Sequence, residues 1–544
     1  MTKQTFIKGA LILLVAGVLN RILGFVPRIA LPRIIGAEGV GLYQLVYPFL
    51  IVMLTVITGG IPLAVAKWIA EAESKGDARR VKQIFRAAMA LSVLLALGLT
   101  VVFALLIPWI STNLMTDSRV YRTLQVTTPL LLIIGIGSVY RGYFQGKQNM
   151  IPTAVSQTVE TIIRIIGSLL FASWLLPYGI EWGAAGAMLG VVAGEIAALA
   201  ILLWNYKDKN NGAQDKSAQH QQAANEAEAG GVTAPPSKTA PSPRKLLKRQ
   251  PILRRLIGLS VPVTASKLIG SFSYLFESIL TARALAAAGL LAAEATALYG
   301  ALQGMIIPIL LLPTALTYSL AVSLVPNLSE AAAKGDRSTI HKRLHQSMRL
   351  SLVTGAPFVV VMGLFAEPIC LLLYDHADIA PMLKWMAPIG LFIYLQAPLQ
   401  AALQALDKPG TALMNTLIGA IVKLVLIVEL ASRPELGIYG ALIAINVNIA
   451  LVTLLHGFSV MRAVGFRMKM LDFIKVGTAM IIMGAASLWI MNQHLLPASW
   501  HNLLVASLLG GLLYIGLMIK MGIVNKDDVT RIPVLGKWLR PRKL

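Results

Sequence analysis

The sequence predicts an all-α polytopic membrane protein with about fourteen spanning helices. These form two pseudo-symmetric six-helix lobes and two extra C-terminal helices. First, only 13% of the 544 residues are charged and 56% are hydrophobic, whereas about 25% of a soluble chain is charged. Second, the mean hydropathy is +0.71, and apolar runs long enough to cross hydrocarbon recur along the chain. Third, one polar phrase occurs twice.

The apolar runs predict helices because they exceed the length of barrel strands and show no alternation. The first run continues too far for a cleavable signal peptide and has no A-x-A end, so we expect it to be the first membrane helix. The expected spans are 7–30, 42–69, 86–110, 121–144, 153–176, 183–206, 256–286, 297–325, 350–373, 382–405, 411–430, 437–461, 471–492 and 501–521.

The repeated phrase indicates an internal duplication. IAEAESKGDARRVKQIFRAAMALS starts at Ile69, and LSEAAAKGDRSTIHKRLHQSMRLS starts 259 positions later at Leu328. Any two amphipathic loops look somewhat alike, but each phrase follows the second helix of a set and contains K-G-D. Six crossings per copy give both copies the same orientation. We expect an N-terminal lobe at 1–206, a second lobe at 250–463, and a C-terminal part at 464–544 with two helices and a basic cytoplasmic tail.

Residues 207–249 break the apolar pattern. They contain almost no large apolar side chain, so they cannot bury enough surface to offset the entropy of ordering. We expect a disordered cytoplasmic linker there, with a docking segment for a partner as the alternative.

The net charge of +23 is concentrated in alternate connections, which favours a topological role over nucleic-acid binding. Positive residues stay on the cytoplasmic side during insertion, so we expect both termini to be cytoplasmic, in the cell inner membrane, with contacts to anionic lipid. The opposite connections hold little beyond Arg33, Arg119, Arg122 and Arg433. The cytoplasmic set includes Lys75, Arg79, Arg80, Lys82, Arg141, Lys147, Arg254, Arg255, Lys334, Arg337, Lys342, Arg343, Lys408, Arg462, Arg467 and Lys469.

The first expected helix carries two deep cations beside a proline. Arg21 and Arg28 flank Pro27, which removes a backbone donor and predicts a kink or break. Broken helices often mark transporter substrate sites, and two guanidiniums suit a phosphate or pyrophosphate. The alternative for Arg28 is an arginine that reaches the outer headgroups, the interpretation we favour for Arg33.

The helix expected at 153–176 has a polar face. Gln157, Glu160 and Arg164 are spaced i, i+3 and i+7, so they share one side. They predict either an ion pair that holds helices together or the wall of a substrate cavity. The next helix adds Glu195, a candidate for ion coupling together with Glu160.

The helix expected at 256–286 carries Lys267, Glu277 and Arg283. Lys267 and Arg283 are candidate substrate-binding cations, and Glu277 is a third candidate for ion coupling. Glu277 and Arg283 do not share a helical face, so we expect each to have a partner on another helix or in water. The helix at 411–430 adds Lys423 and Glu429.

Several chemistries are not expected. The sequence has no Walker A motif, no HExxH and no cluster of metal ligands, and its single cysteine, Cys370, lies in an apolar run. Asp375, His376 and Asp378 are interpreted as a solvated outer loop. We therefore expect no catalytic residues, no metal, no cofactor and no enzymatic activity.

Three stretches resemble a known family. KGALILLVAGVLNRILGFVPRIALPRIIGAEGVGLYQLVYPF and GIPLAVAKWIAEAESKGD resemble the stage V sporulation protein B group. RGYFQGKQNMIPTAVSQTVETIIRIIG resembles this group and lipid II flippases of the MurJ type, within the multidrug/oligosaccharidyl-lipid/polysaccharide (MOP) exporter superfamily. The resemblance covers nearly the whole chain outside 207–249.

The resemblance implies two lobes around a cavity lined by the first, second, seventh and eighth helices, and alternating access for an undecaprenyl-pyrophosphate-linked sugar. The last two helices would form a groove for the lipid tail. The family's R-x-L-G-F segment matches Arg21 to Phe25, and its next arginine falls near Arg28, one residue out of register. The acidic residue that often follows in MurJ proteins is absent.

The expected function is therefore flipping of a lipid-linked cell-wall or polysaccharide precursor such as lipid II, with a role in sporulation or peptidoglycan synthesis and a coupling cation as a candidate partner. Two alternatives remain at this stage. One is a cation-coupled multidrug exporter of the same superfamily, and the other is a membrane scaffold without transport activity.

Overall fold

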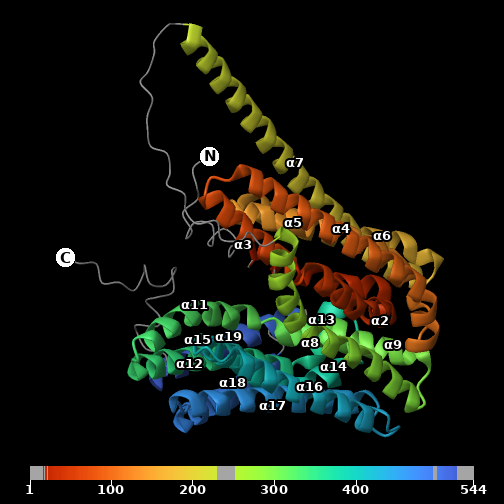
Figure 1. The fold of residues 1–544 in the computed structure, drawn as a ribbon. Helices are drawn as coiled ribbons and strands as arrows, with labels where there is room; N and C mark the ends of the chain where they lie inside the picture. Colours follow the sequence, from red (N-terminus) through yellow and green to blue (C-terminus); the bar gives the residue numbers. More distant parts are fainter. Residues whose placement is uncertain are drawn as a thin grey trace. The chain divides into compact units, whose positions relative to one another are not determined.

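A computed structural model describes residues 16–17, 19–20, 22–229, 251–493, 496 and 499–523, and every regular element among them is a helix (Figure 1). The elements are α2 (Phe25–Thr58), α3 (Ile61–Ser74), α4 (Ala78–Trp109), η1 (Ile110–Leu114), α5 (Val120–Gly146), α6 (Ile151–Leu175), η2 (Leu176–Tyr178), α7 (Ile180–Ala229), α8 (Ile252–Ala287), α9 (Ala292–Gly300), η3 (Ala301–Ile306), α10 (Ile307–Leu311), α11 (Thr314–Ala333), α12 (Arg337–Leu364), α13 (Ala366–Tyr374), α14 (Ala380–Met386), η4 (Ala387–Ile389), α15 (Gly390–Ala405), α16 (Pro409–Ala431), α17 (Ile438–Val464), α18 (Met470–Asn492) and α19 (Ser499–Lys520).

The all-α membrane fold is confirmed. Thirteen helical stretches of the described chain are long and apolar enough to cross a membrane, and one of them, Phe25–Ser74, contains both α2 and α3. The predicted start of the first helix, at residues 7–15, lies outside the described residues.

The helices form two compact units that do not follow chain order. The first unit comprises Met1–Pro27, Val46–Leu114 and Ser118–Leu275, and the second comprises Arg28–Leu45, Met115–Asp117 and Phe276–Leu544. α2 and α8 therefore each contribute residues to both units. The division into lobes at 1–206 and 250–463 remains a prediction.

Within the first unit, α5 packs against α3, α4 and α7, and α6 packs along α7. Its core holds a group of aromatic rings, in which Phe85 lies 5.2 Å from Tyr140, Tyr143 and Tyr206 between ring centroids. In the second unit, α15 packs against α11, α12 and α17, while α16 packs along α17 and α18 along α19.

The helix is interrupted beside Pro27, as predicted, because residues 22–23 are helical, Gly24 forms a turn and α2 begins at Phe25. Pro27 lies in the first turn of α2, where a helix makes no use of the N–H that proline lacks. The helical path is interrupted a second time at Gly36, which has φ +65° and ψ 178°. Glycine adopts this conformation without the steric cost that a Cβ imposes. The expected helix at 42–69 is also divided, because α2 ends at Thr58 and α3 begins at Ile61.

Two other expected helices are built from several segments. The run at 297–325 contains the end of α9, the π-helical turn η3, α10 and the start of α11, and α11 has Pro313 as its N-cap. The run at 350–373 is divided where α12 gives way to α13 at Phe365, whose φ of −112° and ψ of 32° are not helical. Apolar composition alone does not reveal such breaks.

The repeated K-G-D phrase has the same local structure in both copies. Asp77 accepts a hydrogen bond from the Arg80 amide at 2.9 Å and caps α4. In the second copy, Asp336 accepts from the Thr339 amide at 3.0 Å and caps α12. Hydrogen bonds from Thr339 lower the pKa of the Asp336 carboxyl.

The glycines and the charged pairs of the two phrases also match. Gly76 and Gly335 have φ of +69° and +67°, the left-handed conformation that commonly ends a helix. The Lys75–Glu71 and Lys334–Glu330 pairs measure 2.5 and 2.6 Å. Both phrases thus encode one helix–turn–helix corner.

The segment 207–249 differs from the expected disorder in its first part. α7 continues as a helix to Ala229, through residues rich in Ala, Gln, Glu and Lys, which have high helix propensity. Residues 230–250 lie outside the described residues.

The α6–α7 contact can be tested by substitution of Gly190. A Cβ on Gly190 of α7 would lie 2.0 Å from the Ser168 backbone nitrogen of α6. Gly190→Ala therefore separates the helices and should destabilise the protein by about 1–3 kcal/mol. The measurement is thermal unfolding of the purified protein in detergent. The control, Gly98→Ala in α4, meets no atom within 4 Å and should be neutral or slightly stabilising. Equal effects of both changes would contradict this packing.

Candidate functional site

The close packing of α6 and α7 places two membrane carboxylates side by side. Gly190 and Gly194 of α7 face α6 so closely that a Cβ on Gly194 would lie 2.8 Å from the Glu160 carbonyl oxygen. Small residues let helix backbones approach in membranes. Glu195 follows Gly194, so its carboxylate lies close to that of Glu160.

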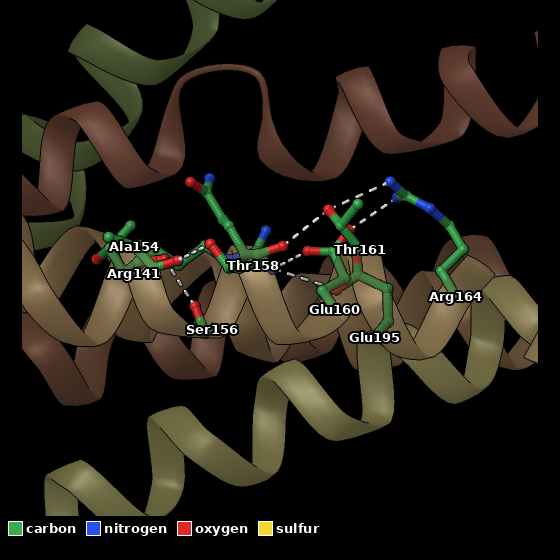
Figure 2. Close-up of polar contacts among 10 residues, drawn as sticks. Arg141, Ala154, Ser156, Thr158, Glu160, Thr161, Arg164 and Glu195 are labelled. Atoms are coloured by element: carbon green, nitrogen blue, oxygen red, sulfur yellow. Dashed lines mark hydrogen bonds and ion pairs between the residues drawn. The ribbon is translucent and has the colours of Figure 1, made fainter. Parts of the chain in front are cut away.

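Arg141 of α5 joins these carboxylates. Its Nη2 lies 2.9 Å from Glu160 Oε2 and 3.3 Å from Glu195 Oε2. Arg164 Nη1 donates to Glu160 Oε1 at 3.0 Å, and Arg164 Nη2 donates to Thr161 Oγ1 at 3.5 Å. Figure 2 shows these side chains as one connected network. We call Arg141, Glu160, Arg164 and Glu195 the four-charge cluster.

Burial divides the cluster into an enclosed part and an open part. The side chains of Glu160, Glu195 and Arg141 are 11%, 12% and 18% exposed, whereas Arg164 is 34% exposed. Two cations and two anions give no net charge, which removes much of the cost of placing charge in hydrocarbon. Arg141 Nε is buried without a hydrogen-bond partner in the described chain. The enclosed part of the cluster therefore contains one N–H donor that is not used within the described residues.

Sequence reasoning found three members of this cluster and missed the fourth. The i,i+4 pairing of Glu160 and Arg164 is present as expected, and Gln157 lies half-buried one turn before Glu160. Arg141 was counted among the cations of a cytoplasmic connection, but it lies within α5, which ends at Gly146. The available sequence signal was its position inside the helix expected at 121–144.

Glu277 forms a second buried pair, in the second unit. Lys423 Nζ of α16 lies 2.5 Å from Glu277 Oε2 of α8, and Gln303 Nε2 of η3 donates to Glu277 Oε1 at 3.0 Å. Lys423 and Glu277 are each 10% exposed. The expectation that Glu277 finds partners on other helices is confirmed.

The remaining candidate cations are not in these clusters. Lys267 donates to the Gly59 carbonyl at 2.8 Å, within the first unit. Arg28 and Arg283 are exposed, and Arg21 lies outside the described residues. Arg33 donates from Nε to the Leu373 carbonyl at 2.8 Å, so it satisfies the end of α13 as well as reaching the surface.

Arg33 also lines a cavity of about 440 Å³ in the second unit. Its other lining residues are Pro32, Gly36, Tyr374, Asp375 and His376. His376 Nδ1 and Asp378 Oδ1 are 3.3 Å apart, and both side chains are exposed. Within the described part of the chain, no group of three or more His, Cys, Asp or Glu is placed to hold a metal ion.

Comparison with known proteins assigns the family. A family model described as polysaccharide biosynthesis protein matches residues 6–330, more than half of the chain. The chain belongs to this family. A second model, MatE, matches residues 271–428.

Curated relatives cover almost the whole length of the chain. Stage V sporulation protein B of Bacillus subtilis (strain 168) is 38% identical over 540 residues, which cover 99% of this chain and 100% of the relative. The lipid II flippase MurJ of the same organism is 25% identical over 564 residues, 97% of each chain.

A solved structure gives the same fold. Lipid II flippase MurJ in an inward closed conformation aligns with a TM-score of 0.65 at 14% identity, covering 94% of this chain and 100% of that one. The resemblance to the MurJ-like flippase group of the MOP superfamily is therefore confirmed, and the protein has the fold of a multi-pass membrane transporter of that superfamily.

The four-charge cluster can be tested by removal of the Arg141 guanidinium. Arg141→Met leaves two buried carboxylates with less compensation, which should cost about 3–5 kcal/mol of unfolding free energy. The measurement is unfolding by sodium dodecyl sulfate in mixed micelles.

Lys147→Met is the control at the end of the same helix. Lys147 lies 3.8 Å from Glu73 and is more exposed, so its loss should cost about 0–1 kcal/mol. If Arg141→Met costs no more than Lys147→Met, the cluster does not stabilise the first unit.

Proposed function

We propose that this protein is an alternating-access flippase that moves a polyprenyl-pyrophosphate-linked cell-wall or polysaccharide precursor, such as lipid II, across the cytoplasmic membrane. The observation that carries the proposal is the similarity, along almost the entire chain, to a lipid II flippase and to a sporulation protein. Both termini are placed in the cytoplasm, because the alternate connections that hold most cations would then lie inside.

The chemistry of the charged groups supports this substrate class. A pyrophosphate needs guanidinium or ammonium donors, while a polyprenyl tail remains in lipid. Arg164 is the member of the four-charge cluster with the most exposed side chain, and its Nη2 makes only a long contact to Thr161. It can therefore give an anion a donor without dismantling the enclosed part.

The alternative is a cation-coupled multidrug exporter, which the MatE match at residues 271–428 favours. Such an exporter needs a membrane carboxylate that can take up a cation. Glu160, Glu195 and Glu277 each contact an arginine or lysine of the chain itself. This compensation favours an anionic substrate over a cationic one.

The candidate substrate cations can be tested by alanine substitution. Arg21→Ala or Arg164→Ala should abolish function while membrane levels stay normal. Glu160 retains Arg141 when Arg164 is removed, so Arg164→Ala orphans no buried carboxylate. The assay is rescue of sporulation in B. subtilis lacking its stage V sporulation protein B, with immunoblots of membranes. Arg79→Ala, an exposed cation of the K-G-D corner, is the control and should rescue fully. Full rescue by both test variants would show that neither arginine binds substrate.

The substrate class is tested by reconstitution. Purified protein in liposomes should move lipid II or another polyprenyl-pyrophosphate glycan between leaflets, and the rate with and without Na⁺ and proton gradients identifies the coupling. Efflux of a cationic dye without movement of any lipid-linked glycan would instead support the exporter.

A further inference from the structure

The buried Glu277 carboxylate is an anionic site oriented by an amide N–H of Gln303, and an ammonium of the chain itself occupies it. Both Glu277 oxygens are engaged, one by Lys423 Nζ at 2.5 Å and one by Gln303 Nε2 at 3.0 Å. We propose that Lys423 is the resident cation of a monovalent-cation site at the Glu277 carboxylate, which Gln303 orients, so that this site takes no metal ion while the lysine is present.

The Glu277–Lys423 pair is buried. Both charged side chains are 10% exposed, so water provides little screening and the charge of Glu277 requires a nearby cation. A lysine delivers a compact point charge on a flexible stem. It thus resembles a small monovalent ion more closely than a planar guanidinium does.

The backbone around Gln303 and Glu277 has features of a functional site. Gln303 lies in η3, a π-helical stretch between α9 and α10, and π-helical turns are frequent at functional sites. Glu277 is held on α8, where its carbonyl accepts a hydrogen bond from Thr281 Oγ1 at 2.7 Å. The amide of Gln303 on η3 and the ammonium of Lys423 on α16 therefore each donate to a different oxygen of the Glu277 carboxylate on α8.

Lys423 has a counterpart at the equivalent position of the first sequence repeat. Lys423 follows Arg164 by 259 positions, the interval that separates the two K-G-D phrases. Arg164 is likewise held by a glutamate, with its Nη1 3.0 Å from Glu160 Oε1. The same repeat position thus carries a tethered cation in each copy, although the paired carboxylate comes from α6 in the first and from α8 in the second.

The experiment removes the tethered cation and offers a free one. Lys423→Met and Lys423→Gln are purified as full-length protein in NaCl, and thermal unfolding is then measured while Na⁺ replaces choline at constant ionic strength. Because a ligand that binds the native state raises the midpoint, both variants should gain a saturable rise of about 2 °C or more. The wild-type midpoint should not depend on Na⁺.

Two controls isolate the carboxylate. The double variant Glu277→Gln/Lys423→Met lacks the negative charge and should not respond to Na⁺. Lys475→Met, which removes another lysine of the second unit that donates to the Met521 carbonyl at 2.7 Å, leaves no carboxylate behind and should not respond either.

Either of two results would overturn the proposal. One is a wild-type protein stabilised by Na⁺ over choline, with the response abolished by Glu277→Gln. The other is folded Lys423→Met and Lys423→Gln proteins with no response to Na⁺. This readout is independent of transport, so a failure of the flippase assay and a failure of the cation site are distinguishable.

Discussion

A carboxylate in the hydrocarbon of a bilayer needs a cation within hydrogen-bonding distance, and each unit of this protein provides one from its own chain. In the first unit, Arg141 and Arg164 compensate Glu160 and Glu195. In the second, Lys423 compensates Glu277. Each cluster joins three helical elements. Because these charges are costly when unpaired, the pairs restrict how the helices can rotate about their axes, and the glycine contacts between helices restrict their spacing.

The two units share local features without sharing a charged site. The K-G-D corner keeps its left-handed glycine, its aspartate cap and its Glu–Lys pair in both copies, because these depend only on neighbours in sequence. The carboxylates depend on which helices pack together, and there the copies have diverged. A common scaffold thus supports two different charge arrangements, one with a partly exposed arginine and one that is enclosed.

Much of the fold could be predicted from the sequence, because apolar length decides whether a helix can span a membrane. The Glu160–Arg164 pair could also be predicted, since residues four apart share a helical face. The Glu277–Lys423 pair is separated by 146 residues, and local spacing contains no information about it. Arg141 was missed for the same reason. The break beside Pro27 could be predicted from the missing N–H of proline, whereas the interruption at Gly36 was missed, because composition does not show which glycine adopts a left-handed conformation.

A flippase for pyrophosphate-linked lipids is consistent with a protein whose own carboxylates are already neutralised and whose Arg164 is partly exposed. The most direct test of internal compensation is a double-mutant cycle between Arg141→Met and Glu160→Gln, measured as unfolding free energy in mixed micelles. The contact of 2.9 Å predicts a coupling energy towards the upper end of about 0.5–3 kcal/mol. Additive effects, with a coupling energy near zero, would contradict the account.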